Sequence, residues 1–174
     1  MENCVVIYKS KTGFTEKYAN WIAEDLGCEI YPLENVSMVD LSEFDVIIFG
    51  GGIRAGRIDG IGFVNKIRTR LPVKKLVIFA TGGTPSNETD AIERVKSMNV
   101  PKNSGIPFFY FQSGFNYEKM KGMDRLLMNM VRGMMRRTKD KDGIQNEMTA
   151  AMKNSYDHSS REFVEPLVNY VKTL

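Results

Sequence analysis

A short run of polar residues near the start of this 174-residue chain has the composition of an anion-binding loop. Residues 10–15 supply three hydroxyl groups, one amine and one glycine, directly after an apolar run and at the start of a helical pattern. Backbone N–H groups at a helix N-terminus attract negative charge, and hydroxyl groups beside them add further donors. A glycine lets the backbone approach a ligand without an intervening Cβ. The residues of this loop are Ser10, Lys11, Thr12, Gly13, Phe14 and Thr15.

Two known nucleotide fingerprints are absent from this loop. It lacks the G-x-G-x-x-G pattern of dinucleotide-binding domains, and it lacks the G-x-x-x-x-G-K-[ST] pattern of P-loop nucleotide hydrolases. An alternative to ligand binding is a Ser/Thr-rich helix cap, although capping needs one hydroxyl and this loop has three. Both interpretations remain open at this point.

Small residues also follow two later apolar runs. Residues 50–57 contain four glycines, and residues 81–85 read Thr-Gly-Gly-Thr-Pro. Small residues let a flat ring lie against the backbone, whose N–H and C=O groups can then contact the edge of the ring. The residues of these two loops that we expect at a ligand are Gly51, Gly52, Ile53, Arg54, Ala55, Gly56, Thr81, Gly82, Gly83 and Thr84.

The elements that must position these loops alternate between apolar runs and amphipathic helical patterns. We predict strands at 3–8, 28–33, 45–50, 76–80 and 106–112. We predict helices at about 14–26, 63–71, 91–98 and 160–173. Nearly continuous apolar strands separated by helices indicate an α/β fold, a parallel sheet with helices on both faces, within a single domain spanning 1–174. Ligands of such sheets bind outside the carboxyl ends of the strands, where all three loops would lie.

The pattern S-x-T-G-x-T after the first strand, followed by the two later loops, resembles the flavodoxin family over essentially the whole chain. This resemblance implies a flavodoxin-like five-stranded parallel sheet of order 2-1-3-4-5. It also implies one FMN cofactor, with its phosphate on residues 10–15 and its isoalloxazine ring between residues 51–57 and 81–85.

Within this family, the chain is similar to the short flavodoxin-like protoporphyrinogen oxidases of bacteria, which pass electrons to quinone. Two features carry the likeness: residues 48–56, Ile-Phe-Gly-Gly-Gly-Ile-Arg-Ala-Gly, and a basic, Met-rich insertion at about 114–145. The chain also departs from electron-carrying flavodoxins, which are usually acidic and often stack an aromatic residue of the second loop on the flavin. Residues 51–57 contain no aromatic residue; Phe14, Phe115 and Tyr117 are candidate substitutes or ordinary packing residues.

The insertion has the periodicity of an amphipathic helix, with Met and Leu residues on one face. Residues 119–141 carry eight basic and two acidic side chains, a local charge of +6 that exceeds the net charge of +3 of the whole chain. Such a helix can lie on an anionic membrane surface, offer an adaptable Met surface to an apolar partner, or simply pack on its own domain. These three possibilities stay open.

The remaining composition limits the function further. No run of about 20 apolar residues and no signal-peptide pattern is present, so we expect a cytoplasmic protein, with attachment to the inner face of the membrane as an open possibility.

Cys4 and Cys28 are too few for a disulfide framework or a CxxC metal site, and we interpret them as small buried residues. The one histidine, His158, lies in a polar stretch and is expected at the surface. We predict no metal site, no nucleic-acid partner and no catalytic side chain, because a flavin carries the redox chemistry itself.

The sequence therefore favours an FMN-dependent oxidoreductase whose partner is a quinone or a redox protein. Two alternatives remain: a flavodoxin-type electron carrier without a substrate of its own, and a flavodoxin-like scaffold that does not bind flavin.

Overall fold

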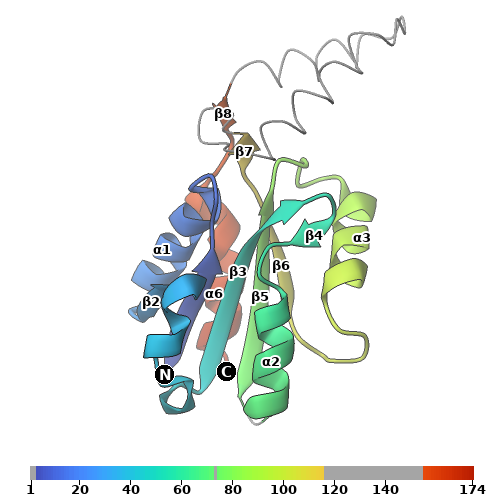
Figure 1. Cartoon of the computed structure of the whole chain (residues 1–174). Helices are drawn as coiled ribbons and strands as arrows, with labels where there is room; N and C mark the ends of the chain where they lie inside the picture. The colour runs from blue at the N-terminus through green and yellow to red at the C-terminus, as the bar shows by residue number, and fades with distance from the viewer. Residues whose placement is uncertain (1–2, 73, 116–154) are drawn as a thin grey trace, which may run out of the picture. The chain divides into compact units, whose positions relative to one another are not determined.

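The computed structural model describes residues 3–72, 74–115 and 155–174 (Figure 1). These residues form two compact units, one of residues 1–113 and 159–174 and the other of residues 114–158. The fold and the candidate site belong to the first unit. The predicted single domain spanning 1–174 stays a prediction.

The first unit is built on five parallel strands. Their order across the sheet is β2-β1-β3-β5-β6, which confirms the predicted flavodoxin-like order 2-1-3-4-5. The central strands are apolar on both faces, as expected when helices cover both sides of a sheet. The bounds of these strands are β1 Cys4–Lys9, β2 Glu29–Pro32, β3 Val46–Arg54, β5 Lys75–Gly82 and β6 Phe108–Gln112.

Four helices flank the sheet close to the predicted positions. Gly27 ends the first of them in the left-handed conformation, φ 63°, which glycine adopts without a steric penalty. Short 3-10 segments connect β2 to β3 and precede the last helix. The bounds are α1 Phe14–Leu26, α2 Gly62–Arg70, α3 Thr89–Asn99, α6 Glu165–Lys172, η1 Leu33–Met38, η2 Leu41–Glu43 and η3 Arg161–Val164.

The alternation of side chains along β1 divides the core between the two faces of the sheet. Cys4 and Val6 pack on the face covered by α1 and α6, whereas Val5 and Ile7 pack on the face covered by α2 and α3 (Figure 1). Both faces of the sheet are therefore buried under helices, and the polar loops lie at the ends of the strands.

The main departure from the predicted boundaries is at β3. This strand was expected to end at Gly50 and to continue as a loop, but it extends to Arg54 and turns back into β4, Arg57–Ile58. The short strand β4 pairs antiparallel with β3, with Ile53 opposite Ile58 and Arg54 opposite Arg57. The prediction of a loop was wrong because the glycines continue the pairing with β5, with Gly51 opposite Ala80 and Gly52 opposite Thr81. They also leave no room for side chains. A Cβ on Gly50 would lie 1.9 Å from Cζ of Phe79, and one on Gly51 would lie 2.5 Å from the backbone oxygen of Asp59.

The last helix begins later than predicted. Ser160 caps the 3-10 segment η3, because its hydroxyl accepts a hydrogen bond from the backbone N–H of Glu162. Pro166 lies in the first turn of α6, where its missing N–H leaves no hydrogen bond unmade. The α-helix therefore starts at Glu165 rather than at residue 160.

The second unit is described only at its two ends. Strands β7, Gly114–Phe115, and β8, Tyr156–Asp157, pair antiparallel, with Gly114 opposite Asp157. The predicted helix of the insertion, within 114–145, falls almost entirely outside the described residues. Among the helices of the described ranges, none is long and apolar enough to cross a membrane.

Candidate functional site

The first loop lies between β1 and α1 and is held in shape by its own polar groups. Gly13 adopts the left-handed conformation, φ 93°, which is rare for any residue with a side chain. The hydroxyl of Ser10 accepts a hydrogen bond from the backbone N–H of Gly13 at 3.1 Å. No side chain caps α1. The alternative of a simple helix cap is therefore wrong, and the uncapped N-terminus has the chemistry of an anion site.

Two buried threonines join the first loop to the third. The hydroxyl oxygens of Thr15 and Thr81 lie 2.8 Å apart, and each residue is only 3% exposed. Gly52 completes this cluster from β3, since a Cβ there would lie 3.4 Å from the Thr15 hydroxyl oxygen. One residue from each predicted loop thus meets at the carboxyl ends of β3 and β5 and the start of α1.

The β3–β4 hairpin forms the second side of the site. Its two-residue turn consists of Ala55, φ 47°, and Gly56, φ 77°, the backbone signs of a type I′ turn. Asn99, the last residue of α3, holds this turn, although the sequence analysis did not single it out. Its side-chain oxygen accepts from the N–H of Ile58 at 2.9 Å, and its amide donates to the carbonyl of Gly56 at 2.8 Å. Because Asn99 is only 7% exposed, these bonds fix the hairpin against α3.

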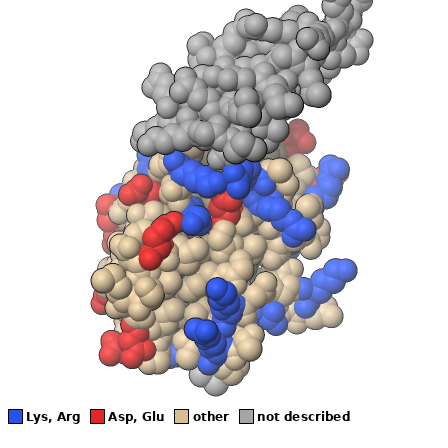
Figure 2. Space-filling model, in the orientation of Figure 1, with Lys and Arg blue, Asp and Glu red and all other residues tan. Residues whose placement is uncertain are grey.

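Basic side chains line this end of the sheet. Lys11 and Arg54 lie on either side of Asp59, with N–O distances of 3.5 and 3.6 Å. Arg57 is also exposed and donates a hydrogen bond to the backbone carbonyl of Met98. Figure 2 shows Lys and Arg side chains gathered along this edge of the described surface. Asp59, which the sequence analysis missed, thus reduces the positive charge of Lys11 and Arg54 at this edge.

The third loop is held by β6. The hydroxyl of Tyr110 lies 2.8 Å from the carbonyl of Gly82 and 2.7 Å from that of Thr84. The side-chain oxygen of Gln112 accepts a hydrogen bond from the N–H of Ser86 at 3.0 Å. Neither residue was predicted at the site, because nothing in a strand rich in aromatics distinguishes a loop-positioning tyrosine from a core one.

The end of β1 carries two further polar contacts. Partial burial and the neighbouring Glu16 carboxylate raise the pKa of Tyr8, so this phenol stays protonated and donates to Glu16 at 3.2 Å. Lys9 forms an ion pair with Glu34 at 2.7 Å, and this hydrogen bond lowers the pKa of Glu34. These contacts hold the strand end that leads into the first loop.

The predicted site residues thus fall into two groups. The structure brings Thr15, Gly52 and Thr81 into one cluster and places Lys11 and Arg54 beside Asp59, whose backbone N–H donates to the carbonyl of Gly52. Ile53 also belongs to this group, because its Cδ1 lies 3.3 Å from where a Cβ on Gly82 would stand.

Other predicted positions have different surroundings. Phe14 is 9% exposed and belongs to the core, so it is not an exposed ring beside the site. The side chains of Phe115 and Tyr117 lie outside the described part of the chain. His158 is exposed, as expected, and its ring lies near that of Tyr156. Within the described residues, no group of three or more His, Cys, Asp and Glu side chains is arranged to hold a metal ion.

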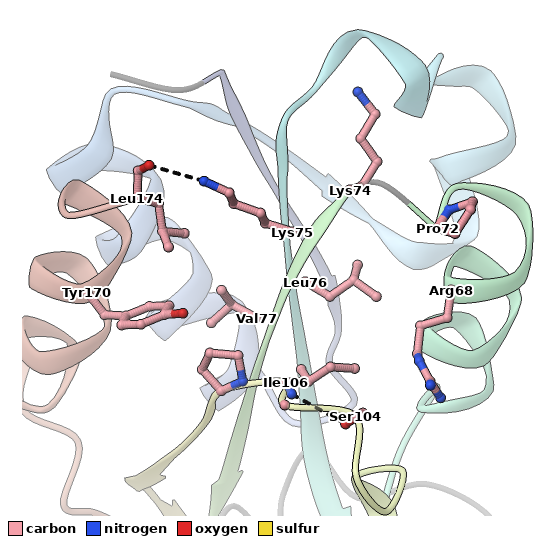
Figure 3. Close-up of a pocket in the computed structure, with 12 residues that line it drawn as sticks. Arg68, Pro72, Lys74, Lys75, Leu76, Val77, Ser104, Ile106, Tyr170 and Leu174 are labelled. Carbon is pink, nitrogen blue, oxygen red and sulfur yellow. Dashed lines mark hydrogen bonds between the residues drawn. The ribbon is translucent and has the colours of Figure 1, made fainter.

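A separate cavity of about 350 Å³ lies at the opposite ends of the strands (Figure 3). Its floor is formed by the start of β5 at Leu76 and Val77, and Tyr170 of α6 lines one side. The ammonium of Lys75 donates to the backbone oxygen of Leu174 at 3.1 Å. Because β5 runs from Lys75 to Gly82, this cavity is roughly 20 Å from Thr81, at about 3.3 Å per residue, and it is not part of the candidate site.

The arrangement defines a doubly wound α/β domain whose first strand is followed by a polar loop at an uncapped helix N-terminus. The chain belongs to the flavodoxin domain family, whose family model matches residues 5–142.

Individual relatives are more distant. The chain is 35% identical over 82 residues to an uncharacterized protein of Methanocaldococcus jannaschii, a match that covers 47% of this chain and 55% of that protein. The chain therefore matches only about half the length of this relative.

Two solved structures illustrate the similarity in three dimensions. A flavoprotein from Lactobacillus acidophilus, solved in complex with FMN, is 14% identical with a TM-score of 0.45, covering 64% of this chain and 93% of that one. A WrbA-like flavodoxin protein from Agrobacterium tumefaciens is 15% identical with a TM-score of 0.41, covering 63% and 83%.

Proposed function

We propose that this chain is a redox flavoprotein that binds one FMN at the carboxyl ends of β1, β3 and β5. One observation carries the proposal: three loops that are far apart in sequence meet at the Thr15–Thr81 hydroxyl pair, beside a helix N-terminus that no side chain caps. Membership of the flavodoxin domain family supports FMN as the ligand.

The residues present fit the two ends of this cofactor. Residues 10–15 would hold the phosphate through backbone N–H groups of the first turn of α1 and through the hydroxyl of Thr12, which has no hydrogen-bond partner among the described residues. Residues 51–56 and 81–84 would hold the ring. Lys11 and Arg54 add positive charge, which favours an anionic ligand. The bound flavin would supply the electron-transfer chemistry, while the protein binds and orients it.

Phosphate recognition can be tested by comparing FMN with riboflavin, which lacks the phosphate. A ligand that binds only the folded state raises the free energy of unfolding by RT ln(1 + [L]/Kd), about 2.7 kcal/mol at a hundredfold excess over Kd. We expect FMN to raise the thermal midpoint clearly, and riboflavin to raise it much less at the same concentration.

A pair of matched variants assigns the effect to the loop. Thr12→Ala is expected to weaken FMN binding about tenfold, the loss of one charge-assisted hydrogen bond. Thr69→Ala removes a hydroxyl that bonds only within α2 and should leave FMN binding unchanged. Equal midpoints with FMN and riboflavin, or no flavin absorbance after adding FMN, would contradict the proposal.

We propose further that the protein is an oxidoreductase resembling the quinone-coupled protoporphyrinogen oxidases. The support is the likeness of residues 48–56, the near-neutral charge of residues 1–113 and the absence of an aromatic residue in 51–57. A flavin ring that lacks an aromatic cover on one face is more accessible to a substrate or a quinone.

The decisive assay supplies protoporphyrinogen and a soluble quinone to the FMN-loaded protein without oxygen. Porphyrin fluorescence should rise together with quinone reduction, and porphyrin should not accumulate when the quinone is omitted. An electron carrier without its own substrate would instead exchange electrons with a reductase while leaving protoporphyrinogen unchanged.

The membrane is a separate proposal, carried by the charge of residues 119–141. Attraction to an anionic surface contributes about 1 kcal/mol per basic residue near it. We expect co-sedimentation with vesicles that contain phosphatidylglycerol at low salt, and loss of this binding at 0.5 M salt or with neutral vesicles, as screening by about a 4 Å Debye length requires. No binding to anionic vesicles at low salt would contradict the proposal.

A further inference from the structure

The two cysteines of the chain lie side by side, which their positions in the sequence do not reveal. The register of the parallel pair β1–β2 places Val5 opposite Glu29 and Val6 opposite Ile30. Continued back by one residue, the same register places Cys4 opposite Cys28. Both side chains lie on the α1 face of the sheet, where Cys28 packs against the core cluster that contains Cys4.

The geometry of paired strands suits a disulfide. Neighbouring strands are about 4.8 Å apart, and a disulfide needs Cα atoms separated by roughly 4.4–6.8 Å. The two thiols also influence one another's ionisation. The neighbouring Cys28 thiol lowers the pKa of the Cys4 thiol, whereas the Cys4 thiol together with burial raises the pKa of Cys28. The pair therefore loses its first proton more readily than its second.

Access to the pair comes from the edge of the sheet. Cys4 is only 6% exposed, but Cys28 is partly exposed and immediately precedes β2, the outermost strand on that side. A small oxidant can thus reach the sulfur of Cys28, and the sulfur of Cys4 lies beside it. Low exposure of Cys4 also disfavours a bond to a second molecule.

We propose that Cys4 and Cys28 form an oxidation site, a dithiol that a peroxide converts reversibly to an intramolecular disulfide. One sulfur attacks the peroxide, so that an S–O bond forms, the O–O bond breaks and water leaves. The second sulfur then attacks the first, so that the S–S bond forms, the S–O bond breaks and a second water leaves. The two thiols lose two electrons in total, which reduce one hydrogen peroxide to two molecules of water.

A flavin at the candidate site would not oxidise these thiols directly, because it would lie too far from them. Cys4 begins β1 and the anion-binding loop follows its end at Lys9, which places the two sites roughly 17 Å apart at 3.3 Å per residue. The disulfide would nevertheless enclose that loop, because residues 10–15 lie between the two cysteines in sequence.

The test treats the full-length native protein with a small molar excess of hydrogen peroxide, then blocks remaining thiols with N-ethylmaleimide and measures the intact mass and the proteolytic peptides. We expect the mass to fall by two hydrogens, a peptide pair joined through Cys4 and Cys28, and complete reversal by dithiothreitol. The trivalent arsenical phenylarsine oxide, which bridges adjacent thiols, should protect both cysteines from N-ethylmaleimide.

Two single variants keep the proposal falsifiable even if the buried one folds poorly. Cys28→Ser and Cys4→Ser should each lose the linked peptide and the arsenical protection. In Cys4→Ser, the remaining Cys28 should form a sulfenic acid that dimedone traps, a product that is scarce in the natural sequence. Linked dimers, two free thiols after peroxide, or equal dimedone labelling with and without Cys4 would each overturn the proposal.

Discussion

The Thr15–Thr81 contact shows how a single pair of side chains can join two distant segments at a functional site. Both hydroxyls are buried, so each satisfies a polar group that would otherwise be costly to remove from water. The contact also fixes the start of α1 against the end of β5, which sets the width of the space between the first and third loops.

The first prediction removes one hydroxyl at a time. Thr15→Val and Thr81→Val should each lower the free energy of unfolding by about 1–2 kcal/mol, because each leaves its partner unsatisfied. The double variant should cost less than the sum of the two by about 0.5–1.5 kcal/mol, as measured by urea unfolding. Strict additivity of the two losses would show that the hydroxyls do not interact.

The second prediction concerns the carboxylate between the two cations. Asp59→Asn removes a negative charge that lies 3.5 and 3.6 Å from Lys11 and Arg54, so FMN affinity should rise severalfold and fall more steeply with salt. Glu43→Gln makes the same change of charge in η2, before the start of β3, and serves as the matched control. A fluorescence titration of FMN at two salt concentrations measures both effects, and weaker binding by the Asp59 variant would count against the assigned role.

Residues 10–15 could be predicted as an anion site because all their signals are local: hydroxyls, a glycine and a helix start within six positions. Asp59, Asn99 and Tyr110 could not, because each acts through a partner that the sheet and its helices bring from far away. Asn99, for example, forms hydrogen bonds with Ile58 and Gly56, which lie 41 and 43 positions earlier in the sequence. A single sequence shows the residue type at such positions but not the neighbour that gives it a role.

At the scale of elements, Gly50 of β3 has a packing role that the sequence did not indicate. Gly50 was expected to open a ligand loop, yet its missing side chain makes room for the ring of Phe79 in the next strand. A glycine run after an apolar stretch is typical of a loop, and a strand with close packing on one side has the same composition.

The third prediction follows from that packing. Gly50→Ala should destabilise the fold by about 2–3 kcal/mol, since the new Cβ overlaps the Phe79 ring in a filled core. Gly62→Ala is the control: its Cβ meets nothing within 4 Å, and alanine favours the start of α2 by up to about 0.5 kcal/mol. Denaturant midpoints with unchanged m-values give both numbers. A neutral Gly50→Ala would contradict the assignment.

The fourth prediction tests the turn of the β3–β4 hairpin. Ala55 adopts a left-handed conformation that costs a residue with a Cβ about 1 kcal/mol or more. Ala55→Asn creates the Asn-Gly pair favoured in type I′ turns and should stabilise the protein by about 0.5–1 kcal/mol. Ala55→Val should destabilise it, because a branched side chain tolerates this conformation least. Thermal unfolding that shifts in the same direction for both variants would be inconsistent with the turn.

At the scale of the whole molecule, the strand order and the covering of both faces could be predicted because alternating apolar strands and amphipathic helices leave few arrangements. The division into two units could not be predicted, since it depends on which segments contact one another rather than on composition.

The fifth prediction separates the two units. Because β7 and β8 pair antiparallel, the two ends of the segment between them are neighbours, and an Asn-Gly turn can join Phe115 to Tyr156 in place of residues 116–155. We expect this shortened chain to unfold in one cooperative transition within a few degrees of the full chain. It should fail to co-sediment with anionic vesicles. Retained vesicle binding would move the proposed membrane contact to the first unit.

The face of the sheet that packs against α1 is fully covered only when α6 is in place, and this limits the order in which the protein can fold. Val164, Leu167 and Val168 are almost fully buried in the same cluster as Val6 and Ile22, although they follow β6 by more than forty residues. A growing chain on the ribosome therefore exposes the part of this face that α1 does not cover until α6 has emerged. Non-local contacts of this kind slow folding and lengthen the exposure of aggregation-prone surface. The protein should consequently depend on chaperones during synthesis more than its small size suggests.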